Sequence, residues 1–449
     1  MGRLFGTDGA RGVANSELTC ELAMNIGKAA AMVLTEGRNT CPKILIGKDT
    51  RISSDMIEGA LIAGLSSVGA DIITLGVIPT PAVAFLVGKY KADAGIMISA
   101  SHNPCEFNGI KILSGDGYKL PDALEEQIEA IVLDHVEKYP CPTGEKIGRL
   151  TKAENAIKDY VDHVKTTVPF ALDGMNIALD CANGAASTTA KELFEALGAN
   201  VHIIHDKPDG TNINKDCGST HMEDLQKYVI KNELDAGLAF DGDADRCLAV
   251  DDKGNIVDGD YIMAICALDI KSRGKLAKDT VVGTIMTNMG FIKLCEENGI
   301  NFIATKVGDR YVLEEMLLEE YNFGGEQSGH LIFKDFATTG DGQLTGAHLL
   351  SILKRRQAKL SSLATLMQRY PQITVNVKVS AEGKLKFYTD HEIKKATNEA
   401  KKTLSNTGRI VVRVSGTEPL IRVMAEGEDT KLIEKTAKQV AQVIEKRLN

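Results

Sequence analysis

The segment Gly198-Ala199-Asn200-Val201-His202-Ile203-Ile204 ends a stretch, residues 176–206, in which an apolar strand, a small polar loop, an amphipathic helix and a second apolar strand follow one another. The same order recurs in residues 43–76 and 280–309, each time with a glycine shortly before the second strand. Parallel strands need a helical crossover, so these copies predict parallel pairing in α/β layers. The predicted fold class is α/β, with three mixed α/β domains that are either related or only similar in style.

The C-terminal part of the chain has a different pattern. Residues 373–379 and 409–414 alternate apolar with polar side chains, and residues 431–448 predict a closing helix. We therefore expect a small α+β domain here. Tyr370-Pro371 is a predicted hinge, because proline and the residue before it resist helix continuation. The predicted domains are residues 1–154, 155–252, 253–367 and 371–449.

Composition limits the classes of function. The chain has 449 residues, 43% of them hydrophobic and 25% charged, and a formal net charge of -9, which argues against general nucleic-acid binding. Its nine cysteines include no C-x-x-C pair, as expected of reduced thiols in a cytosol. No signal peptide and no apolar run near ~18 residues is present. We expect a soluble, cytoplasmic protein that binds neither nucleic acid nor membrane and holds anionic substrates by local clusters.

Three carboxylates alternate in Asp241-Gly242-Asp243-Ala244-Asp245-Arg246, directly after the apolar run 236–240. Such close like charges repel unless a cation lies among them, and hard carboxylate oxygens suit Mg²⁺ or Ca²⁺. An EF-hand is disfavoured, because Arg246 and Asp252 stand where its glycine and final glutamate belong. A solvated acidic turn is the alternative. Arg246 favours the metal site, since a guanidinium beside a metal clamps phosphoryl oxygens.

A second polar loop, Ser99-Ala100-Ser101-His102-Asn103-Pro104, follows the predicted buried strand 93–99. Ligands of α/β folds bind at this end of a strand. If the strand continued, His102 and Ser101 would point to opposite faces, so a hydrolase triad is disfavoured. A plain Ser/Asn/Pro turn remains an alternative. Lys111 stands on the following segment, either as a functional cation or as a surface charge.

Three further loops carry suitable chemistry. Residues 324–330, Gly-Gly-Glu-Gln-Ser-Gly-His, combine glycines that admit a ligand with side chains that bind sugar hydroxyls or amines. Residues 413–422 place backbone N–H groups between two arginines, as in an anion nest for a phosphate monoester. Residues 6–12 form a flexible loop with one arginine. Taken alone, residues 413–422 are equally consistent with a plain inter-strand turn. A hairpin or loop apex is the alternative for residues 324–330, and residues 6–12 alone are a weak signal.

Together, residues 5–12, 99–104, 241–246, 324–330 and 413–422 resemble the motifs of the α-D-phosphohexomutase superfamily, in the family's order and over essentially the whole chain. The resemblance implies four domains, each giving one loop to a central cleft: a phosphoserine, a metal-binding, a sugar-binding and a phosphate-binding loop. Ala244 replaces a glycine that is common in the superfamily, a small change. With Gln327 in the sugar-binding loop and Ser99 before Ala100, these motifs resemble those of the branch that acts on glucosamine phosphates more than those of the phosphomannomutase or phosphoglucomutase branches.

The resemblance implies a role for each matching residue. Ser101 is implied as the phosphorylated residue, and Lys111 or a neighbour as the proton shuttle, with a pKa that burial beside cations would lower. The catalytic residues implied are Ser101, His102, Lys111, Arg11 and Arg246. The metal ligands implied are Asp241, Asp243 and Asp245 with the Ser101 phosphate. The substrate-binding residues implied are Glu326, Ser328, His330, Arg413, Ser415, Gly416, Thr417 and Arg422.

The implied reaction transfers the phosphoryl group of phosphoserine 101 to O1 of glucosamine 6-phosphate, and the bound 1,6-bisphosphate then turns over and returns its other phosphoryl group. The implied cofactors are one Mg²⁺ per active site and a sugar 1,6-bisphosphate activator, and the family implies a homodimer. The alternatives are a phosphomannomutase or phosphoglucomutase, a silent sugar-phosphate sensor and a simple phosphatase.

Overall fold

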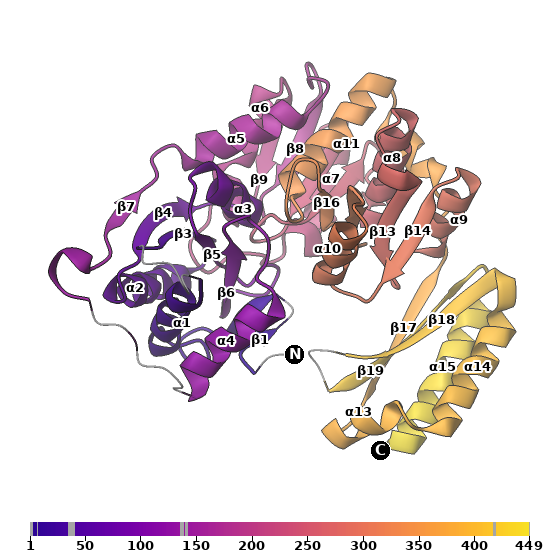
Figure 1. Cartoon of the computed structure of the whole chain (residues 1–449). Coiled ribbons are helices and arrows are strands. Elements are labelled where there is room, and N and C mark those ends of the chain that lie inside the picture. Colours follow the sequence, from indigo (N-terminus) through magenta and orange to yellow (C-terminus); the bar gives the residue numbers. More distant parts are fainter. Residues whose placement is uncertain are drawn as a thin grey trace. The chain divides into compact units, whose positions relative to one another are not determined.

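The computed structural model describes residues 3–6, 8–34, 41–134, 139, 142–415 and 419–448. The chain divides into two compact units: unit 1 comprises Met1–Thr284 and Ile303–Leu366, and unit 2 comprises Ile285–Phe302 and Met367–Asn449. Figure 1 colours the chain from indigo at its N-terminus to yellow at its C-terminus. Each unit is described by itself.

The first sheet of unit 1 has seven strands in the order β1-β2-β6-β5-β3-β4-β7. Strands β5, β3, β4 and β7 are parallel neighbours, whereas β6 is antiparallel to β5 and to β2. The predicted parallel pairing across residues 43–76 is thus confirmed. The strands are β1 (Phe5–Gly6), β2 (Gly9–Val13), β3 (Lys43–Lys48), β4 (Asp71–Val77), β5 (Ala94–Ile98), β6 (Phe107–Ser114) and β7 (Leu150–Lys152).

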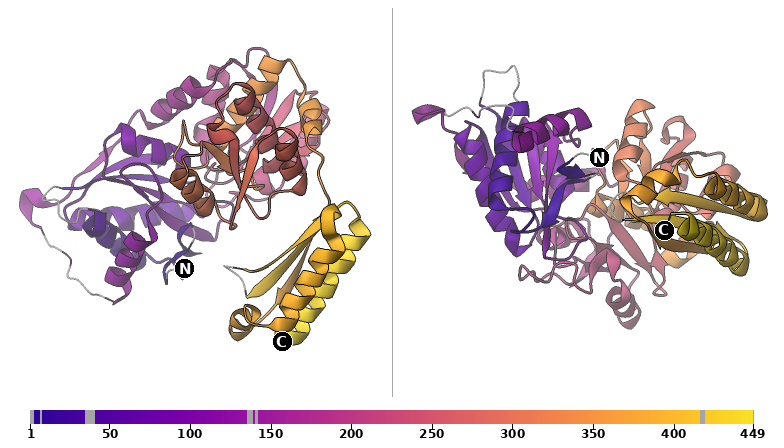
Figure 2. Two further views of the ribbon diagram at one scale, coloured as in Figure 1. Left: turned by 45° about the vertical axis from the view of Figure 1, so that its right-hand side comes forward. Right: turned by 90° about the horizontal axis from the view of Figure 1, so that it is seen from below.

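Helices pack on both faces of this sheet (Figure 2). Apolar side chains of α1, α2 and α4 share one buried core with Ile46 and Ile96 of the sheet. Helix α3 packs on the other face, where a Cβ at Gly47 would meet Val83 at 2.5 Å, so glycine is needed for this close approach. The helices are α1 (Cys20–Leu34), α2 (Ile52–Ser67), α3 (Thr80–Lys89) and α4 (Asp122–Asp134).

A second sheet of unit 1 has the order β12-β11-β10-β8-β9. Strand β8 is parallel to β9 and β10, which confirms the predicted pairing across residues 176–206, and β10 forms an antiparallel hairpin with β11. Buried Leu225 and Val229 of α7 pack against Ala178 and Ala239 of the sheet. The elements are β8 (Asn176–Asp180), β9 (Asn200–Ile204), β10 (Ala236–Phe240), β11 (Cys247–Asp251), β12 (Ile256–Val257), α5 (Ala156–Thr167), α6 (Ala190–Ala196) and α7 (Glu223–Lys231).

A third sheet has the order β14-β13-β15-β16. Strands β13 and β14 of the third predicted copy are neighbours, β13 is parallel to β15, and β15 and β16 form an antiparallel hairpin. The strands are β13 (Thr280–Thr284), β14 (Asn301–Thr305), β15 (Phe323–Gly325) and β16 (Leu331–Phe333). The helices in this part of the sequence are α8 (Gly259–Ser272), α10 (Asp309–Leu318), α11 (Gly342–Arg356) and α12 (Leu360–Leu363), and α9 (Met289–Glu297), which belongs to unit 2.

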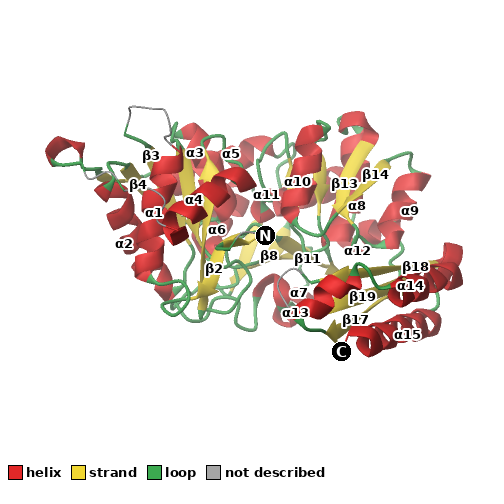
Figure 3. Ribbon diagram, turned by 60° about the horizontal axis from the view of Figure 1, so that its bottom comes forward, coloured by secondary structure: helices red, strands yellow, loops and turns green. Residues whose placement is uncertain are grey.

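The C-terminal part of unit 2 is the predicted α+β arrangement (Figure 3). Its antiparallel sheet has the order β17-β19-β18. Alternate residues, such as Ile410, Ile421 and Val423, form a buried core with Ile433 and Ile444 of α15. The elements are β17 (Gln372–Lys378), β18 (Gly408–Val414), β19 (Leu420–Gly427), α13 (Ala381–Phe387), α14 (His391–Leu404) and α15 (Thr430–Leu448).

Three of the predicted functional loops have the same place in their sheets. Residues 99–106, 241–246 and 326–330 each connect two strands that are antiparallel neighbours. A connection of this kind gathers polar side chains at one end of a hairpin, which is where such folds position ligand-binding groups.

Candidate active site

Ser101 lies beside the acidic loop of the second sheet. Its Oγ donates a hydrogen bond of 2.7 Å to Asp241 Oδ2, and the residue is 1% exposed. Ser99 points elsewhere: its Oγ donates to Asp49 Oδ2 over 2.7 Å and accepts from the Ser101 N–H over 2.9 Å. Of the two serines at the end of this strand, Ser101 is thus the one whose hydroxyl contacts the acidic loop.

The predicted metal ligands converge as expected. Asp241, Asp243 and Asp245 are almost fully buried, and each offers a carboxylate oxygen within 4.8 Å of the others. The hairpin turns at Ala244, whose φ of 56° is left-handed and explains why a glycine is common at this place. Asp243 Oδ1 is buried without a hydrogen-bond partner. Clustered hard oxygens with an unsatisfied member suit a divalent metal ion.

The charges around this cluster are unevenly balanced. Burial raises the pKa of Asp241 to about 8, helped by the negative charges of Asp245 and Asp243. Burial also opposes ionisation of Asp245, but Lys111 and His330 outweigh it and hold the pKa of that carboxyl well below its usual range. A bound cation would relieve the repulsion that keeps Asp241 protonated.

Lys111 is a charge partner of these carboxylates. Its Nζ lies 2.7 Å from Asp243 Oδ2, 3.1 Å from Asp8 Oδ2 and 3.4 Å from Asp245 Oδ2, and the residue is 3% exposed. Burial disfavours the ammonium, but the three carboxylates outweigh it and raise the pKa of Lys111 well above its usual value. The expectation of a lowered pKa was therefore wrong, because the charges that meet here are predominantly negative.

His102 is closer to Ser101 than the sequence suggested. Strand β5 ends at Ile98, and the chain turns through Ser101 with a φ of 52°, so the strand does not continue and the two side chains meet: His102 Nδ1 lies 3.4 Å from Ser101 Oγ. Arg246 Nη1 donates to the same Nδ1 over 3.2 Å. Burial, with Arg246 and Arg11 nearby, lowers the pKa of His102 to about 4, so the ring is neutral at pH 7.

The two predicted arginines of unit 1 contact different carboxylates of one network of charges. Arg246 Nε lies 3.9 Å from both Asp241 and Asp245, and the side chain is 24% exposed. Arg11 forms an ion pair with Asp8, which also contacts Lys111. Alternating cations and carboxylates of this kind hold one another in fixed positions, as a phosphoryl-transfer site requires.

The predicted sugar loop borders the same cluster. His330 Nδ1 lies 3.6 Å from Asp245 Oδ1, while its Nε2 accepts a 3.0 Å hydrogen bond from the Gly340 N–H. Glu326, which is half-buried, accepts a 3.0 Å hydrogen bond from the N–H of Gly308. Ser328 is half-buried at the tip of the hairpin. The loop is thus joined to the acidic cluster through His330.

In unit 2, the predicted arginines form a pair. Arg413 on β18 lies directly opposite Arg422 on β19, and both are half-buried on the face of the sheet that turns away from its helices. Ser415 is buried, and its N–H donates to the Leu420 carbonyl over 2.9 Å. Two like charges at directly opposed positions destabilise a sheet unless an anion lies with them. Gly416 and Thr417, also predicted here, lie outside the described residues.

Comparison with known proteins identifies the family. Models of the phosphoglucomutase/phosphomannomutase family match four successive segments: alpha/beta/alpha domain I at residues 2–138, domain II at 158–254, domain III at 258–370 and the C-terminal domain at 375–443. A phosphoglucosamine mutase of Acetivibrio thermocellus is 56% identical over 448 residues, and one of Clostridium novyi is 55% identical over 449, each alignment covering 100% of both chains. The chain belongs to the phosphoglucosamine mutase family.

Solved structures confirm the fold expected of a phosphoglucosamine mutase family member. A phosphoglucomutase/phosphomannomutase family protein of Burkholderia thailandensis superposes with a TM-score of 0.84 at 23% identity, covering 99% of this chain and 98% of that one. The N-acetylphosphoglucosamine mutase of Aspergillus fumigatus, solved in complex with GlcNAc-6P and magnesium, gives a TM-score of 0.68 at 16% identity, covering 99% and 96%.

Two residues near the site of this phosphoglucosamine mutase family member were not predicted from the sequence. Asp49, just beyond β3, accepts hydrogen bonds from Ser99 and from Arg51 Nε, the latter over 2.8 Å. Thr80 Oγ1 donates to Asp243 Oδ2 over 2.7 Å. The rule that polar residues after buried parallel strands line the site would have found Asp49, because it follows the apolar run of residues 44–47.

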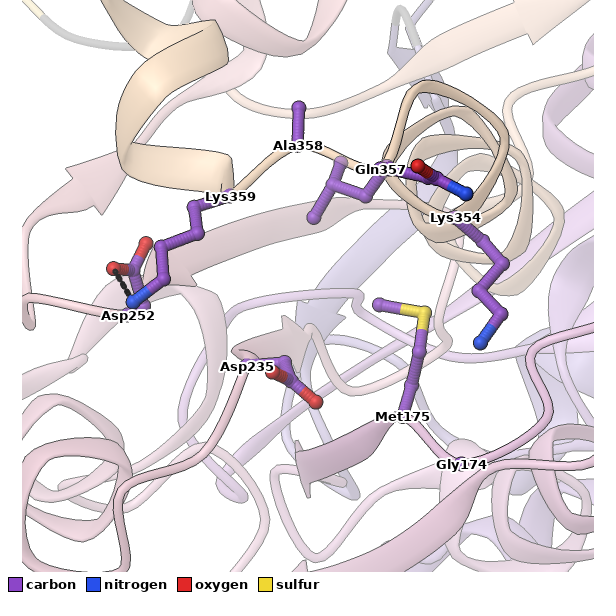
Figure 4. Close-up of a pocket in the computed structure, with 9 residues that line it drawn as sticks. Gly174, Met175, Asp235, Asp252, Lys354, Gln357, Ala358 and Lys359 are labelled. Atoms are coloured by element: carbon purple, nitrogen blue, oxygen red, sulfur yellow. Dashed lines mark ion pairs between the residues drawn. The ribbon is translucent and has the colours of Figure 1, made fainter.

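A separate pocket lies away from this chemistry (Figure 4). It has a volume of about 380 Å³, and Asp252 and Lys359 at its rim form an ion pair of 3.5 Å. None of the predicted site residues lines it. No helix in the described part of the chain is long and apolar enough to cross a membrane.

Proposed function

We propose that this chain interconverts glucosamine 6-phosphate and glucosamine 1-phosphate through phosphoserine 101 and a bound 1,6-bisphosphate. The observation that carries this proposal is the 2.7 Å hydrogen bond between Ser101 Oγ and Asp241 within a buried carboxylate cluster. A hydroxyl beside a metal-suited cluster and two arginines is the arrangement that phosphoryl transfer needs. The 53–56% identity to phosphoglucosamine mutases supports the amino sugar as substrate.

The first transfer would join phosphorus to O1 of the sugar and break its bond to Ser101 Oγ. Lys111, held in its charged form by three carboxylates, stabilises negative charge on the transferred group and does not act as a neutral base. We propose that the neutral His102 passes the proton of O1 to Ser101 Oγ as that oxygen leaves phosphorus, because its Nδ1 lies 3.4 Å from Ser101 Oγ. Arg246, which contacts the same Nδ1, orients the ring.

Mg²⁺ would be held by Asp241, Asp243 and Asp245 with an oxygen of the Ser101 phosphate, and it would neutralise charge on the phosphoryl oxygens. A sugar 1,6-bisphosphate would first phosphorylate Ser101. Glu326 and Ser328, at the tip of their hairpin, would bind the sugar, with His330 beside them fixing the position of Asp245. Arg413, Ser415, Gly416, Thr417 and Arg422 would bind the phosphate that is not being transferred.

The test is a coupled assay of glucosamine 1-phosphate formation from glucosamine 6-phosphate, with Mg²⁺ and glucose 1,6-bisphosphate, run beside glucose and mannose phosphates. The proposal expects a strong preference for the amino sugar. Comparable rates on neutral sugars would favour a phosphomannomutase or phosphoglucomutase. Stoichiometric release of inorganic phosphate would indicate a phosphatase, and absence of turnover with every sugar would indicate a sensor.

The proposed product serves the synthesis of UDP-N-acetylglucosamine and of peptidoglycan, both of which begin from cytoplasmic sugar phosphates. We therefore propose a cytoplasmic enzyme. We also propose that it forms the homodimer expected of its family, which sedimentation analysis would test.

A further inference from the structure

A long loop of the second sheet is closed at its base by one buried carboxylate. This loop, residues 205–218, runs from the end of β9 to the segment before α7. At its start His205 Nδ1 lies 3.0 Å from Asp180 Oδ2, and at its end the Gly218 N–H donates to the same oxygen over 3.0 Å. Asp180 is fully buried. Both ends of the loop are thus anchored to the last residue of β8.

The far part of the loop reaches the phosphoserine loop of the first sheet. Asn214 Nδ2 donates to the Ser101 carbonyl over 2.8 Å and to the Asn103 carbonyl over 3.1 Å. Its own N–H donates to Ala182 O over 2.9 Å, which ties Asn214 back to the second sheet. The side chain is 8% exposed, so these hydrogen bonds form with little competition from water.

The same two carbonyls are held from the other side by Arg51. Its Nη2 donates to Ser101 O over 2.9 Å and to Asn103 O over 2.8 Å, and the guanidinium is buried. Arg51 belongs to the first sheet's own body, whereas Asn214 belongs to the second. The backbone of the phosphoserine loop is therefore fixed to both bodies that supply the reacting groups.

Ser101 needs such fixing because its backbone is strained. Its φ of 52° is left-handed, a conformation that costs a serine on the order of 1 kcal/mol unless its surroundings enforce it. The metal-binding loop approaches the same point, since a Cβ at Gly242 would meet Ser101 O at 2.5 Å and Asn214 Nδ2 at 2.9 Å. Asn214 thus lies where the loops that carry the nucleophile and the metal ligands come together.

We propose that Asn214 is a positioning residue, and that loop 205–218 uses it to set the position of Ser101 Oγ relative to the carboxylates of residues 241–245. The inference rests on the proposed function. It assigns to the second sheet a role besides supplying metal ligands: it holds the phosphoserine loop in register with them. Misplacement of a reacting group by about 1 Å can cost about a hundredfold in rate.

The test uses the full-length enzyme and two variants. Asn214→Gly removes the amide without backbone strain, because the φ of 58° at this position favours glycine. Asn214→Asp keeps the shape but replaces the donor by an acceptor that faces two carbonyls. The matched control is Asp216→Gly, an exposed residue of the same loop whose φ is also left-handed, at 53°.

The expected result is a fall in kcat of about tenfold or more in both Asn214 variants, with KM for glucosamine 6-phosphate changed less than about threefold. We also expect slower phosphorylation of Ser101 by glucose 1,6-bisphosphate, followed by intact-protein mass spectrometry. The Mg²⁺-induced rise in melting temperature should persist in both, because the metal ligands are untouched. Asp216→Gly should behave as the wild type.

Two results would overturn the inference: wild-type kcat in a folded Asn214→Gly enzyme, or a loss of activity that matches the unfolded fraction alone. If neither Asn214 variant folds, His205→Gln decides, since weakening the base of the loop should lower kcat in the same direction, and an unchanged kcat would refute the role. Failure of the proposed function is distinguishable, because the wild type itself would then turn over no glucosamine phosphate.

Discussion

Ser101 Oγ donates a hydrogen bond to Oδ2 of Asp241, a residue 140 positions further along the chain. Because the pKa of Asp241 is raised to about 8, chiefly by burial, Ser101 is paired with a carboxyl group that is reluctant to ionise. Phosphorylation of Ser101 and binding of a cation would both change the charge at this point.

Ser101→Ala should abolish turnover and leave the fold intact. The substitution removes the oxygen that carries the phosphoryl group, and deletion of one hydroxyl has little effect on packing. The coupled assay and a thermal melt measure the two effects. Ser99→Ala is the informative comparison: it removes a hydrogen bond to Asp49 and should reduce activity without eliminating it. Substantial turnover by Ser101→Ala, with Ser99 unphosphorylated, would contradict the assignment.

Asp243→Asn should weaken the response to Mg²⁺. The neutral amide removes one anionic ligand while still accepting the hydrogen bond of Thr80. We expect the Mg²⁺ concentration for half-maximal rate to rise about tenfold or more, and the Mg²⁺-induced rise in melting temperature to shrink. Asp224→Asn, on the exposed face of α7, makes the same change of net charge and should respond to Mg²⁺ as the wild type does. An unaltered metal response in Asp243→Asn would mean that the cluster is structural.

Arg422→Ala should lower kcat/KM by roughly ten- to a hundredfold, the effect of about 1.5–3 kcal/mol for a charge-assisted hydrogen bond to phosphate. It should also lower the melting temperature less than an ordinary core substitution, because it removes the charge opposite Arg413. Inorganic phosphate should stabilise the wild type and not this variant. Lys386→Ala, an exposed cation of α13, is the control. Equal kcat/KM in Arg422→Ala and the wild type would exclude a phosphate-binding role.

The stability of unit 1 should fall in acid partly through His348 of α11. Burial lowers its pKa from 6.5 to about 4, and its Nε2 lies 3.1 Å from Thr167 Oγ1. The imidazole of His348 takes up a proton near pH 6.5 in the unfolded chain and only near pH 4 in the folded chain. The contribution of neutral His348 to the free energy of unfolding is therefore complete above pH 6.5 and is lost as the pH falls. At pH 5 the loss is about 2 kcal/mol.

Urea unfolding at pH 7 and pH 5 tests this expectation in the wild type and in His348→Gln, whose side chain does not titrate. The difference in unfolding free energy between the two pH values should be smaller in the variant by about 2 kcal/mol. His221→Gln, at an exposed position, should leave the difference unchanged. The same pH dependence in His348→Gln and the wild type would exclude His348 as its source.

The sequence predicted those features that depend on local pattern. The apolar run before Ser99 is strand β5, residues 236–240 are strand β10, and the closing helix is α15. The carboxyl ends of the two strands carry predicted loops, because the backbone leaves the sheet at the end of a strand.

Features set by distant segments were not predictable in the same way. The direction in which the pKa of Lys111 shifts depends on three carboxylates, those of Asp8, Asp243 and Asp245, which meet around its ammonium group. No local pattern in the sequence reveals that they meet. The contact between Ser101 and His102 depends on a left-handed turn at Ser101. If the strand had continued, the two side chains would have pointed to opposite faces and the contact would not form. Nothing in the sequence around Asn214 indicates its role, because that role depends on its hydrogen bond to the Ser101 carbonyl, 113 residues away.

The long separation in sequence between Ser101 and the hairpin of residues 241–246 has a consequence for synthesis of the protein. Ser101 leaves the ribosome long before Asp241 does. Lys111 likewise lacks its nearest carboxylate partner until Asp243 has emerged. A chain that is still being synthesised therefore has Ser101 before it has the carboxylate that accepts the Ser101 hydrogen bond. Chains truncated before Asp241 lack the whole carboxylate cluster of residues 241–245.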